Sequence, residues 1–213
     1  MDEPIIAIAR FSLKEAYRAE TERFEKAMDR FRTAVAGAAG LRRTLLLRGA
    51  GQPGEYALLT WWRDADAHRS VIGELSFFVE VTGELMLLGD LTAAKAVTLD
   101  GYVAPGADPA EAGIVAYTDF TLDDPASAEG FQRGFASKAD FMRAQDGFVA
   151  QEFLQSKSQA GGYVNLGWWR DMGALQASFR KPEFAEDVQK TAAVAAVRPA
   201  VFEVMSDSVF AAT

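Results

Sequence analysis

The residues best suited to chemistry lie in one short segment, Tyr163-Val-Asn-Leu-Gly-Trp-Trp-Arg-Asp171. Side chains alternate between the two faces of a strand, so Tyr163, Asn165, Gly167 and Trp169 are expected to share one face. Asn165 is the only asparagine of the chain. An amide and an indole N–H separated by a glycine leave room for a flat molecule, and both can donate hydrogen bonds to an oxyanion in an apolar pocket. We predict that Asn165 and Trp169 are catalytic and that Tyr163 and Gly167 bind the substrate.

The same segment occurs earlier in the chain as Tyr56-Ala-Leu-Leu-Thr-Trp-Trp-Arg-Asp64, with six of nine positions identical. All four tryptophans lie in these two copies. The offset of 107 residues also carries Gly54 onto Gly161. Two copies of a unit of this length fill the chain, which indicates a duplicated domain rather than a solenoid of short repeats.

The first copy carries part of the same chemistry. Tyr56 and Trp62 are expected on the corresponding face and are predicted to bind substrate, but Leu58 takes the place of the asparagine. His68 follows six residues after Trp62, and because imidazole titrates near neutrality it is a candidate catalytic base. Leu175 stands at this position in the second copy, so the alternative interpretation is that His68 is a surface or half-buried residue without a catalytic role.

Hydropathy patterning predicts the elements that position these residues. In the first copy we expect strands at 5–11, 41–48, 56–62 and 94–103, a helix at 22–38 and a helical region from 67 to 88. In the second copy we expect strands at 114–120, 148–156, 163–169 and 199–206, with a helix opening at Asp124-Pro125. The order is β-α-β-β-α-β, a ferredoxin-like unit of the α+β class. The predicted domains are 1–103 and 113–213, joined by a linker rich in Gly, Pro and Ala at 104–112.

A four-stranded sheet with helices on one face leaves its other face uncovered. Leu59 and Trp61 in the first copy, and Leu166 and Trp168 in the second, are expected on that face. We therefore predict that the two repeats pack sheet to sheet as an intramolecular dimeric α+β barrel.

Composition excludes several classes of function. With one histidine and no cysteine, the chain cannot form a thiolate or multi-histidine metal site by itself, so no metal is predicted. A net charge of −8 argues against nucleic acid and anionic membranes as partners. Gly49-Ala-Gly51-Gln-Pro-Gly54 matches a dinucleotide fingerprint in spacing, but a strand follows it instead of a helix, so no cofactor-binding residues are predicted. The acidic start runs directly into a strand, which predicts a cytoplasmic protein without a targeting peptide.

The Tyr/Asn-x-x-x-Trp strand, followed by an aspartate and a short helix, resembles the antibiotic biosynthesis monooxygenase family of the dimeric α+β barrel class, in a tandem two-domain form. In the anthrone oxygenases of that family, an asparagine four residues before a tryptophan helps hold and activate the substrate. Asn165 and Trp169 match that spacing, whereas the first copy matches only at Trp62. His68 matches a Tyr or His that the family often places six residues after the tryptophan. The haem-degrading branch has a histidine about ten residues after it, where this chain has Ile72 and Phe179.

The resemblance implies a cofactor-independent oxygenase that oxidises a flat polyphenolic substrate of the anthrone or polyketide type to a quinone. O₂ would be the co-substrate, with diffusible reduced flavin left open. The alternatives are a polyketide cyclase-like enzyme with His68 as its base, or a non-catalytic protein that binds a small molecule. The expected partner is a small aromatic substrate, and the fused chain is expected to be a monomer or a homodimer.

Overall fold

The computed structural model describes residues 3–74 and 78–210, and their contacts divide the chain into two compact units. Unit 1 comprises residues 1–97 and 204–213, and unit 2 comprises residues 98–203. Each repeat has the predicted β-α-β-β-α-β order. The hydrogen-bonded strand order, β1-β3-β2-β8-β5-β7-β6-β4, closes as an eight-stranded barrel. The predicted fold class is therefore confirmed.

The elements of the first repeat are β1 (Ile5–Leu13), η1 (Glu15–Tyr17), α1 (Thr21–Val35), β2 (Leu41–Gly49), β3 (Glu55–Trp62), α2 (Ala65–Ile72), η2 (Phe78–Thr82), α4 (Gly83–Leu88) and β4 (Gly89–Val103). The helical region expected from 67 to 88 is divided into separate elements, and its residues 75–77 lie outside the described part of the chain. The strand expected from residue 94 begins at Gly89, because β1 pairs with β4 as far as the Leu13–Gly89 pair.

The elements of the second repeat are η3 (Pro109–Glu111), β5 (Ile114–Leu122), η4 (Pro125–Ser127), α5 (Ala128–Arg143), β6 (Phe148–Ser156), β7 (Gly162–Trp169), α6 (Met172–Phe179), α7 (Pro182–Ala192) and β8 (Ala195–Val209). The last strand is longer than the 199–206 expected, because β5 pairs with it from Leu122–Ala195 to Ile114–Glu203. The burial pattern of β5 matches that of β1 at all but one position.

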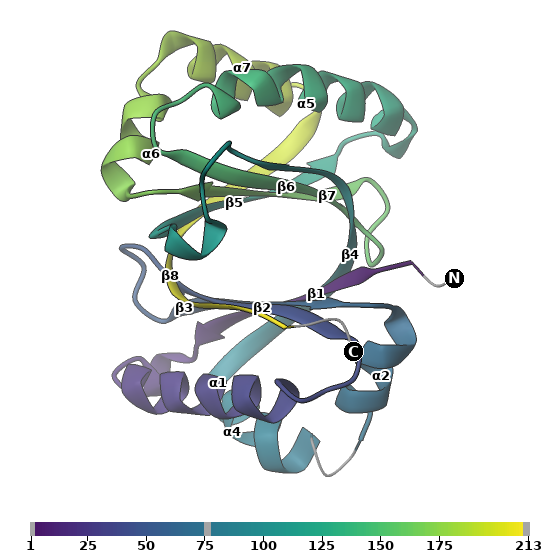
Figure 1. Ribbon diagram of the computed structural model, residues 1–213, viewed down its shortest axis with the longest axis vertical. Helices are drawn as coiled ribbons and strands as arrows, with labels where there is room; N and C mark the ends of the chain where they lie inside the picture. Colours follow the sequence, from purple (N-terminus) through teal and green to yellow (C-terminus); the bar gives the residue numbers. More distant parts are fainter. Residues whose placement is uncertain (1–2, 75–77, 211–213) are drawn as a thin grey trace. The chain divides into compact units, whose positions relative to one another are not determined.

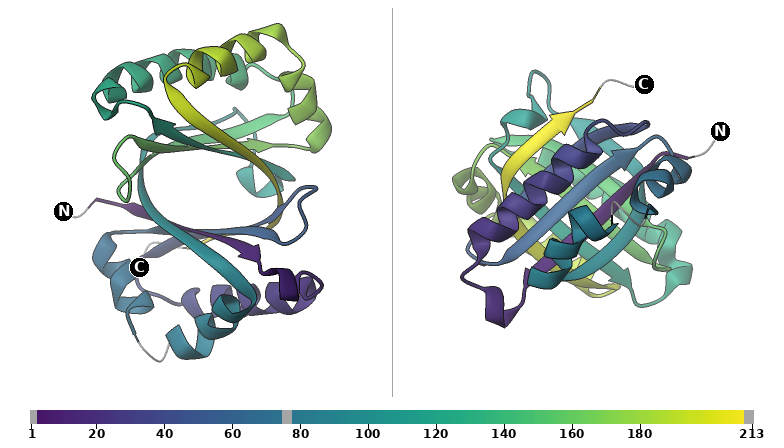
Figure 2. Two further views of the ribbon diagram at one scale, coloured as in Figure 1. Left: turned by 180° about the vertical axis from the view of Figure 1, so that it is seen from behind. Right: turned by 90° about the horizontal axis from the view of Figure 1, so that it is seen from below.

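Amphipathic helices cover one face of the sheet in each unit (Figure 1). In unit 1, α1 lies along the strands (Figure 2) and buries Phe24, Met28 and Val35, while most of its charged side chains are exposed. In unit 2, α5 contributes Phe131 and Phe135 to the core above the sheet. None of the helices between residues 3–74 and 78–210 is long and apolar enough to cross a membrane.

The faces of β3 and β7 follow the predicted alternation. Tyr56, Leu58 and Trp62 pack with residues of the helices in unit 1, and Tyr163 and Trp169 do so in unit 2. The side chains predicted for the opposite face, those of Leu59, Trp61, Leu166 and Trp168, alternate with these. The Arg43 guanidinium lies 4.8 Å from the centre of the Trp61 ring.

The aspartate of the repeated Trp-Trp-Arg-Asp motif has a structural role in both repeats. The carboxylates of Asp64 and Asp171 cap α2 and α6 by accepting hydrogen bonds from the backbone N–H groups of Ala67 (2.7 Å) and Ala174 (2.8 Å). These bonds lower the pKa of both carboxyl groups. Gly147 has a φ of 76°, and a Cβ there would lie 2.5 Å from the Cβ of Ala174. The glycine lets the loop before β6 pack closely against the first turn of α6.

Candidate active site

The centre of the candidate site is a pair of amide side chains on neighbouring strands of unit 2. Asn165 lies in the middle of β7, and Gln151 projects from β6 with 4% of its surface exposed. Gln151 Nε2 donates a hydrogen bond of 2.9 Å to Asn165 Oδ1. The pairing leaves the NH₂ group of Asn165 as a donor. It also leaves Gln151 Oε1 buried without a hydrogen-bond partner among the described residues.

Trp169 supplies a second buried donor beside this pair. The side chain is fully buried, and its Nε1 finds no hydrogen-bond acceptor in residues 3–74 and 78–210. A Cβ added to Gly167 would lie 3.4 Å from Trp169 Nε1, so the indole nitrogen lies directly beside this glycine. Gly167 is also the cross-strand partner of Gln151. The unpartnered indole N–H therefore lies beside the glycine whose cross-strand partner is Gln151.

Such groups are costly in a protein interior. Leaving a buried donor or acceptor unpaired costs about 1–3 kcal/mol, because the group loses its hydrogen bonds to water. Their surroundings are apolar on both sides. Ile114, Phe148 and Leu175 cluster around Trp169, while Phe120 and Phe153 cluster at the other end of β7. In such surroundings, hydrogen bonds to a developing negative charge are stronger than in water.

Tyr163, predicted to bind substrate, lies within the aromatic cluster at the start of β7. Its ring stacks on Phe153 at a centroid distance of 5.4 Å, and its hydroxyl accepts a 3.0 Å hydrogen bond from Gln132 Nε2. These contacts place Tyr163 two residues before Asn165 as part of the packed wall beside the amide pair.

The first repeat pairs the corresponding indole internally, whereas Thr44 Oγ1, at the position of Gln151, is also buried without a partner among the described residues. Trp62 Nε1 donates a 2.8 Å hydrogen bond to Thr60 Oγ1, and Thr60 occupies the position of Gly167. Leu58 replaces Asn165 and packs in an apolar cluster. The Tyr56 hydroxyl donates to Glu25 Oε1 at 2.9 Å, and burial together with this contact raises the pKa of Tyr56. Unit 1 therefore presents an apolar leucine and a paired indole where unit 2 presents free donors.

His68 belongs to unit 1 and lies beside Trp62, with the two ring centres 5.5 Å apart in an edge-to-face arrangement. The side chain is half-buried, and Nδ1 has no hydrogen-bond partner within the described residues. Burial lowers the pKa of His68 to about 4, with contributions from the positive charges of Lys95 and Arg69. His68 is therefore neutral at pH 7. The structure brings Asn165, Gly167 and Trp169 together, whereas His68 belongs with Trp62.

Gln151 is the residue of this site that the sequence analysis did not identify. Its available signal is the 107-residue offset, which carries Thr44 onto Gln151 and so marks a polar position shared by both repeats. The cross-strand register was needed to place Gln151 opposite Gly167 and within reach of Asn165.

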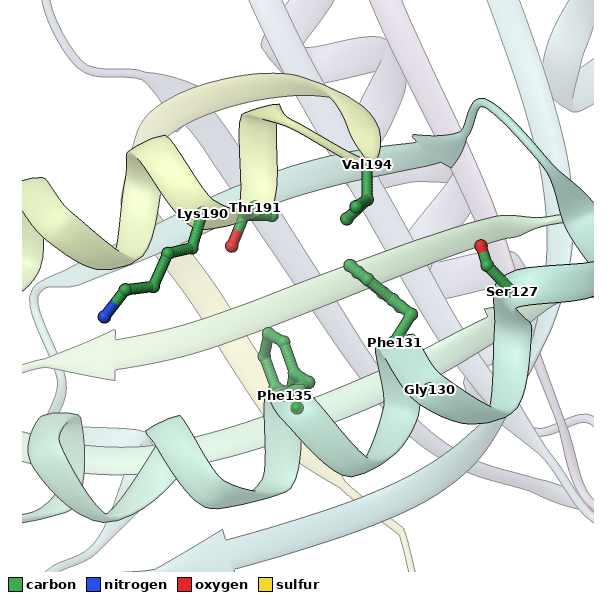
Figure 3. Close-up of a pocket in the computed structure, with 8 residues that line it drawn as sticks. Ser127, Gly130, Phe131, Phe135, Lys190, Thr191 and Val194 are labelled. Carbon is green, nitrogen blue, oxygen red and sulfur yellow. The ribbon is translucent and has the colours of Figure 1, made fainter.

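A cavity of about 270 Å³ lies between α5 and α7 in unit 2 (Figure 3). Its lining residues are Ser127, Gly130, Phe131, Gly134, Phe135, Lys190, Thr191 and Val194. Neither Asn165 nor Trp169 lines it. Phe135 stacks on Phe153 with ring centres 3.9 Å apart, and Phe153 is the cross-strand neighbour of Asn165. The Phe135 and Phe153 rings thus connect the cavity lining with the strand position beside Asn165.

Comparison with known families establishes the family to which the chain belongs. The sequence profile of the antibiotic biosynthesis monooxygenase family matches residues 4–70 and 115–190, one segment in each repeat. The chain belongs to the antibiotic biosynthesis monooxygenase family. No curated protein sequence matches the chain significantly.

Solved structures with the same fold extend over nearly the whole chain. One is an anthrone oxidase-like protein (TM-score 0.77, 11% identity, covering 98% of this chain and 94% of that one). Another is a proposed monooxygenase from Fusobacterium nucleatum subsp. nucleatum (TM-score 0.76, 11% identity, covering 98% and 95%). A proposed monooxygenase from Lactobacillus acidophilus has a TM-score of 0.68 at 12% identity, covering 98% and 97%. At these identities the likeness concerns the fold.

Proposed function

We propose that this protein is a cofactor-independent oxygenase that converts a flat polyphenolic substrate of the anthrone type into a quinone with O₂. The observation that carries the proposal is the pair of donors at Asn165 and Trp169, of which the Trp169 indole N–H is buried and has no acceptor among the described residues. Membership of the monooxygenase family supports oxygen chemistry. We assign the site to unit 2.

The donors fit the difficult step of this reaction. An anthrone is a carbon acid, and loss of a proton from its methylene carbon places negative charge on the carbonyl oxygen. Hydrogen bonds from Asn165 Nδ2 and Trp169 Nε1 to that oxygen stabilise the enolate and lower the pKa of the carbon acid, with the proton passing to solvent. The apolar clusters on both sides lower the local dielectric and so strengthen these hydrogen bonds.

The remaining steps use the electrons of the substrate. The enolate transfers one electron to O₂, giving a substrate radical and superoxide, which combine to form a C–O bond. After protonation the product is a hydroperoxide. Loss of the remaining hydrogen from the same carbon and cleavage of the O–O bond release water and form the second carbonyl. The substrate is oxidised by four electrons in all, and O₂ is reduced to one oxygen of the quinone and one of water.

The cavity between α5 and α7 is the proposed entrance. It is lined on one side by Phe131 and Phe135, and rotation of these rings would connect it with the Asn165 amide. Side-chain rotation of this kind is fast compared with a typical turnover. A flat aromatic substrate can replace the ring-to-ring contacts that such a rotation breaks.

The test is oxygen uptake by the purified chain with a model hydroxy-anthrone and no added cofactor. We expect Asn165→Ala and Trp169→Phe each to lower the rate by roughly 100-fold, the usual effect of removing one donor to an oxyanion. Thr60→Ala, which removes the acceptor of Trp62 in unit 1, is the matched control and should leave the rate unchanged. Equal rates for the wild type and both unit 2 variants would contradict the proposal.

The same experiment separates the alternatives. A cyclase would turn over its substrate without oxygen and lose that activity in His68→Ala. A binding protein would hold the anthrone tightly without consuming oxygen above the rate of spontaneous oxidation. Oxygen uptake that appears only after adding reduced flavin would identify flavin as a diffusible co-substrate.

A further inference from the structure

The cavity between α5 and α7 is open at positions where the helix could carry larger side chains. Its lining includes Gly130 and Gly134, one turn apart on α5. Apart from the backbone of α5 itself, a Cβ added to either glycine would meet no atom of the described residues within 4 Å. Glycine within a helix is less favourable than alanine, because it loses more backbone entropy on folding. No close neighbour requires a glycine at either position, so the effect of the two residues is to keep the cavity open.

Unit 1 fills the corresponding space with two leucines. Leu88 and Val194 occupy equivalent places, since their carbonyl oxygens accept hydrogen bonds from the residues that directly follow β1 and β5. Three residues earlier in the two units lie Leu85 and Thr191. Leu85 and Leu88 are fully buried in one apolar cluster with Phe24 of α1. The smaller Val194 and Thr191 line the cavity of unit 2 instead.

The charge beside this space is also reversed between the units. Glu84 of unit 1 forms ion pairs with Arg23 and Arg30 of α1. By the same correspondence, the equivalent residue of unit 2 is Lys190, which lines the cavity. Its Nζ lies 3.6 Å from a carboxylate oxygen of Glu186, and both side chains are mostly exposed. Such a surface pair contributes little free energy, so the ammonium group can also attract an anion in the cavity.

The volume and the lining of the cavity define the ligand that it can hold. An apolar cavity of roughly 150 Å³ holds one benzene molecule. At about 270 Å³, the cavity of unit 2 has room for one ring or two fused rings with a small substituent. Phe131 and Phe135 face it from α5 (Figure 3) and provide aromatic surface on which a flat ring can pack.

We propose that the cavity between α5 and α7 is a second binding site of unit 2, which takes an aromatic carboxylate of one or two rings. The ring packs on Phe131 and Phe135 beside the two glycines, and the carboxylate lies toward Lys190. The site is separate from Asn165 and Trp169, neither of which lines the cavity. Binding there does not depend on the oxygenase reaction. Because the cavity is also the proposed entrance, a bound carboxylate would compete with the substrate for it.

The test is the binding of 2-naphthoate, measured by calorimetry, with the neutral 2-naphthamide for comparison. Gly134→Leu places a side chain in the cavity, and we expect it to weaken the binding of both compounds by roughly 10-fold or more. Thr191→Leu, which copies Leu85, is a second filling variant with the same expected result. Ala136→Leu adds the same side chain at an exposed position of α5 and is the matched control, which should bind like the wild type. Circular dichroism establishes beforehand that each variant is folded.

Two further variants test the charge and the location of the site. Lys190→Gln should weaken the binding of naphthoate roughly 2- to 5-fold, the range of an exposed ion pair, and leave that of naphthamide unchanged. Asn165→Ala should leave the binding of both compounds unchanged. No binding to the wild type, binding that survives both filling variants, or binding that is lost in Asn165→Ala would overturn the inference.

A Lys190→Gln variant that binds naphthoate like the wild type would overturn the choice of an anion. Because all these measurements are made without turnover, failure of the oxygenase proposal would be seen separately, in oxygen uptake.

Discussion

The two repeats share the residues that build the fold and differ in those that could do chemistry. Both have the paired tryptophans, the capping aspartates and the glycines at positive φ. They differ where side chains meet on the helix-covered face. The pairs, first repeat before second, are Thr44 and Gln151, Leu58 and Asn165, Thr60 and Gly167, and His68 and Leu175.

The difference shows how the two repeats of a duplicated chain can come to have different roles. In unit 1 the Trp62 indole is paired with Thr60, so its position is satisfied by the protein itself. In unit 2 the equivalent indole faces a glycine, and its hydrogen bond is left for another molecule. The shared tryptophan is thus a structural residue in one unit and a candidate recognition group in the other.

The largest effect on activity should come from replacing Gly167 of unit 2 with threonine, the residue at the equivalent position of unit 1. In Gly167→Thr, the new hydroxyl can accept a hydrogen bond from Trp169 Nε1 as Thr60 Oγ1 does from Trp62 Nε1. We expect oxygen uptake to fall by roughly 100-fold or more. Gly167→Ala adds bulk without an acceptor and should have a smaller effect. A fully active Gly167→Thr variant would show that the glycine is not the feature that distinguishes unit 2 from unit 1.

The reverse exchange, Leu58→Asn, should affect stability rather than activity. Leu58 is buried in an apolar cluster with Leu46 and Met28, where an amide has no ready partner. We expect a loss of about 1–3 kcal/mol in the free energy of unfolding, measured by urea denaturation. A variant as stable as the wild type would mean that unit 1 can also accommodate the polar pair.

The capping aspartates should behave alike in the two units. Asp64→Ala and Asp171→Ala each remove a hydrogen bond to the backbone at a helix N-terminus, and we expect each to cost about 1 kcal/mol of stability. Urea denaturation of the two variants side by side provides the measurement. A large cost for only one of them would show that the shared motif has different structural roles in the two repeats.

The smallest expected effect is on the pH dependence of stability. The pKa of His68 is lowered from its ordinary 6.5 to about 4, so the unfolded chain binds a proton more readily than the folded one. This residue therefore lowers stability progressively as the pH falls from 6.5 to about 4. His68→Leu, which copies Leu175, should weaken that pH dependence, measured as urea midpoints at several pH values. An identical pH dependence would show that His68 is solvated in the folded state.

The alternation of apolar residues along strands and their spacing along helices were sufficient to predict the order of the elements and the faces of β3 and β7. The turn at Gly49–Gly54 was predicted correctly because the apolar and aromatic run after it favours a strand, β3. The extents of β4 and β8 were missed, since tertiary pairing with β1 and β5 extends these strands beyond their local sequence signal. Gln151 was missed for a related reason, because its role depends on strand register and not on spacing along the chain.

The division of the last strand between the units bears on synthesis at the ribosome. Residues 204–213 belong with unit 1, where Arg43 Nε donates a 2.8 Å hydrogen bond to Asp207 and the backbone N–H of Phe210 donates to Arg42. The first repeat, although translated first, therefore lacks part of its sheet until residues 204–209 of β8 have been made. Its edge at β2 stays unpaired while the second repeat is being made, so nascent chains held at that stage are where chaperone binding and misassembly should concentrate.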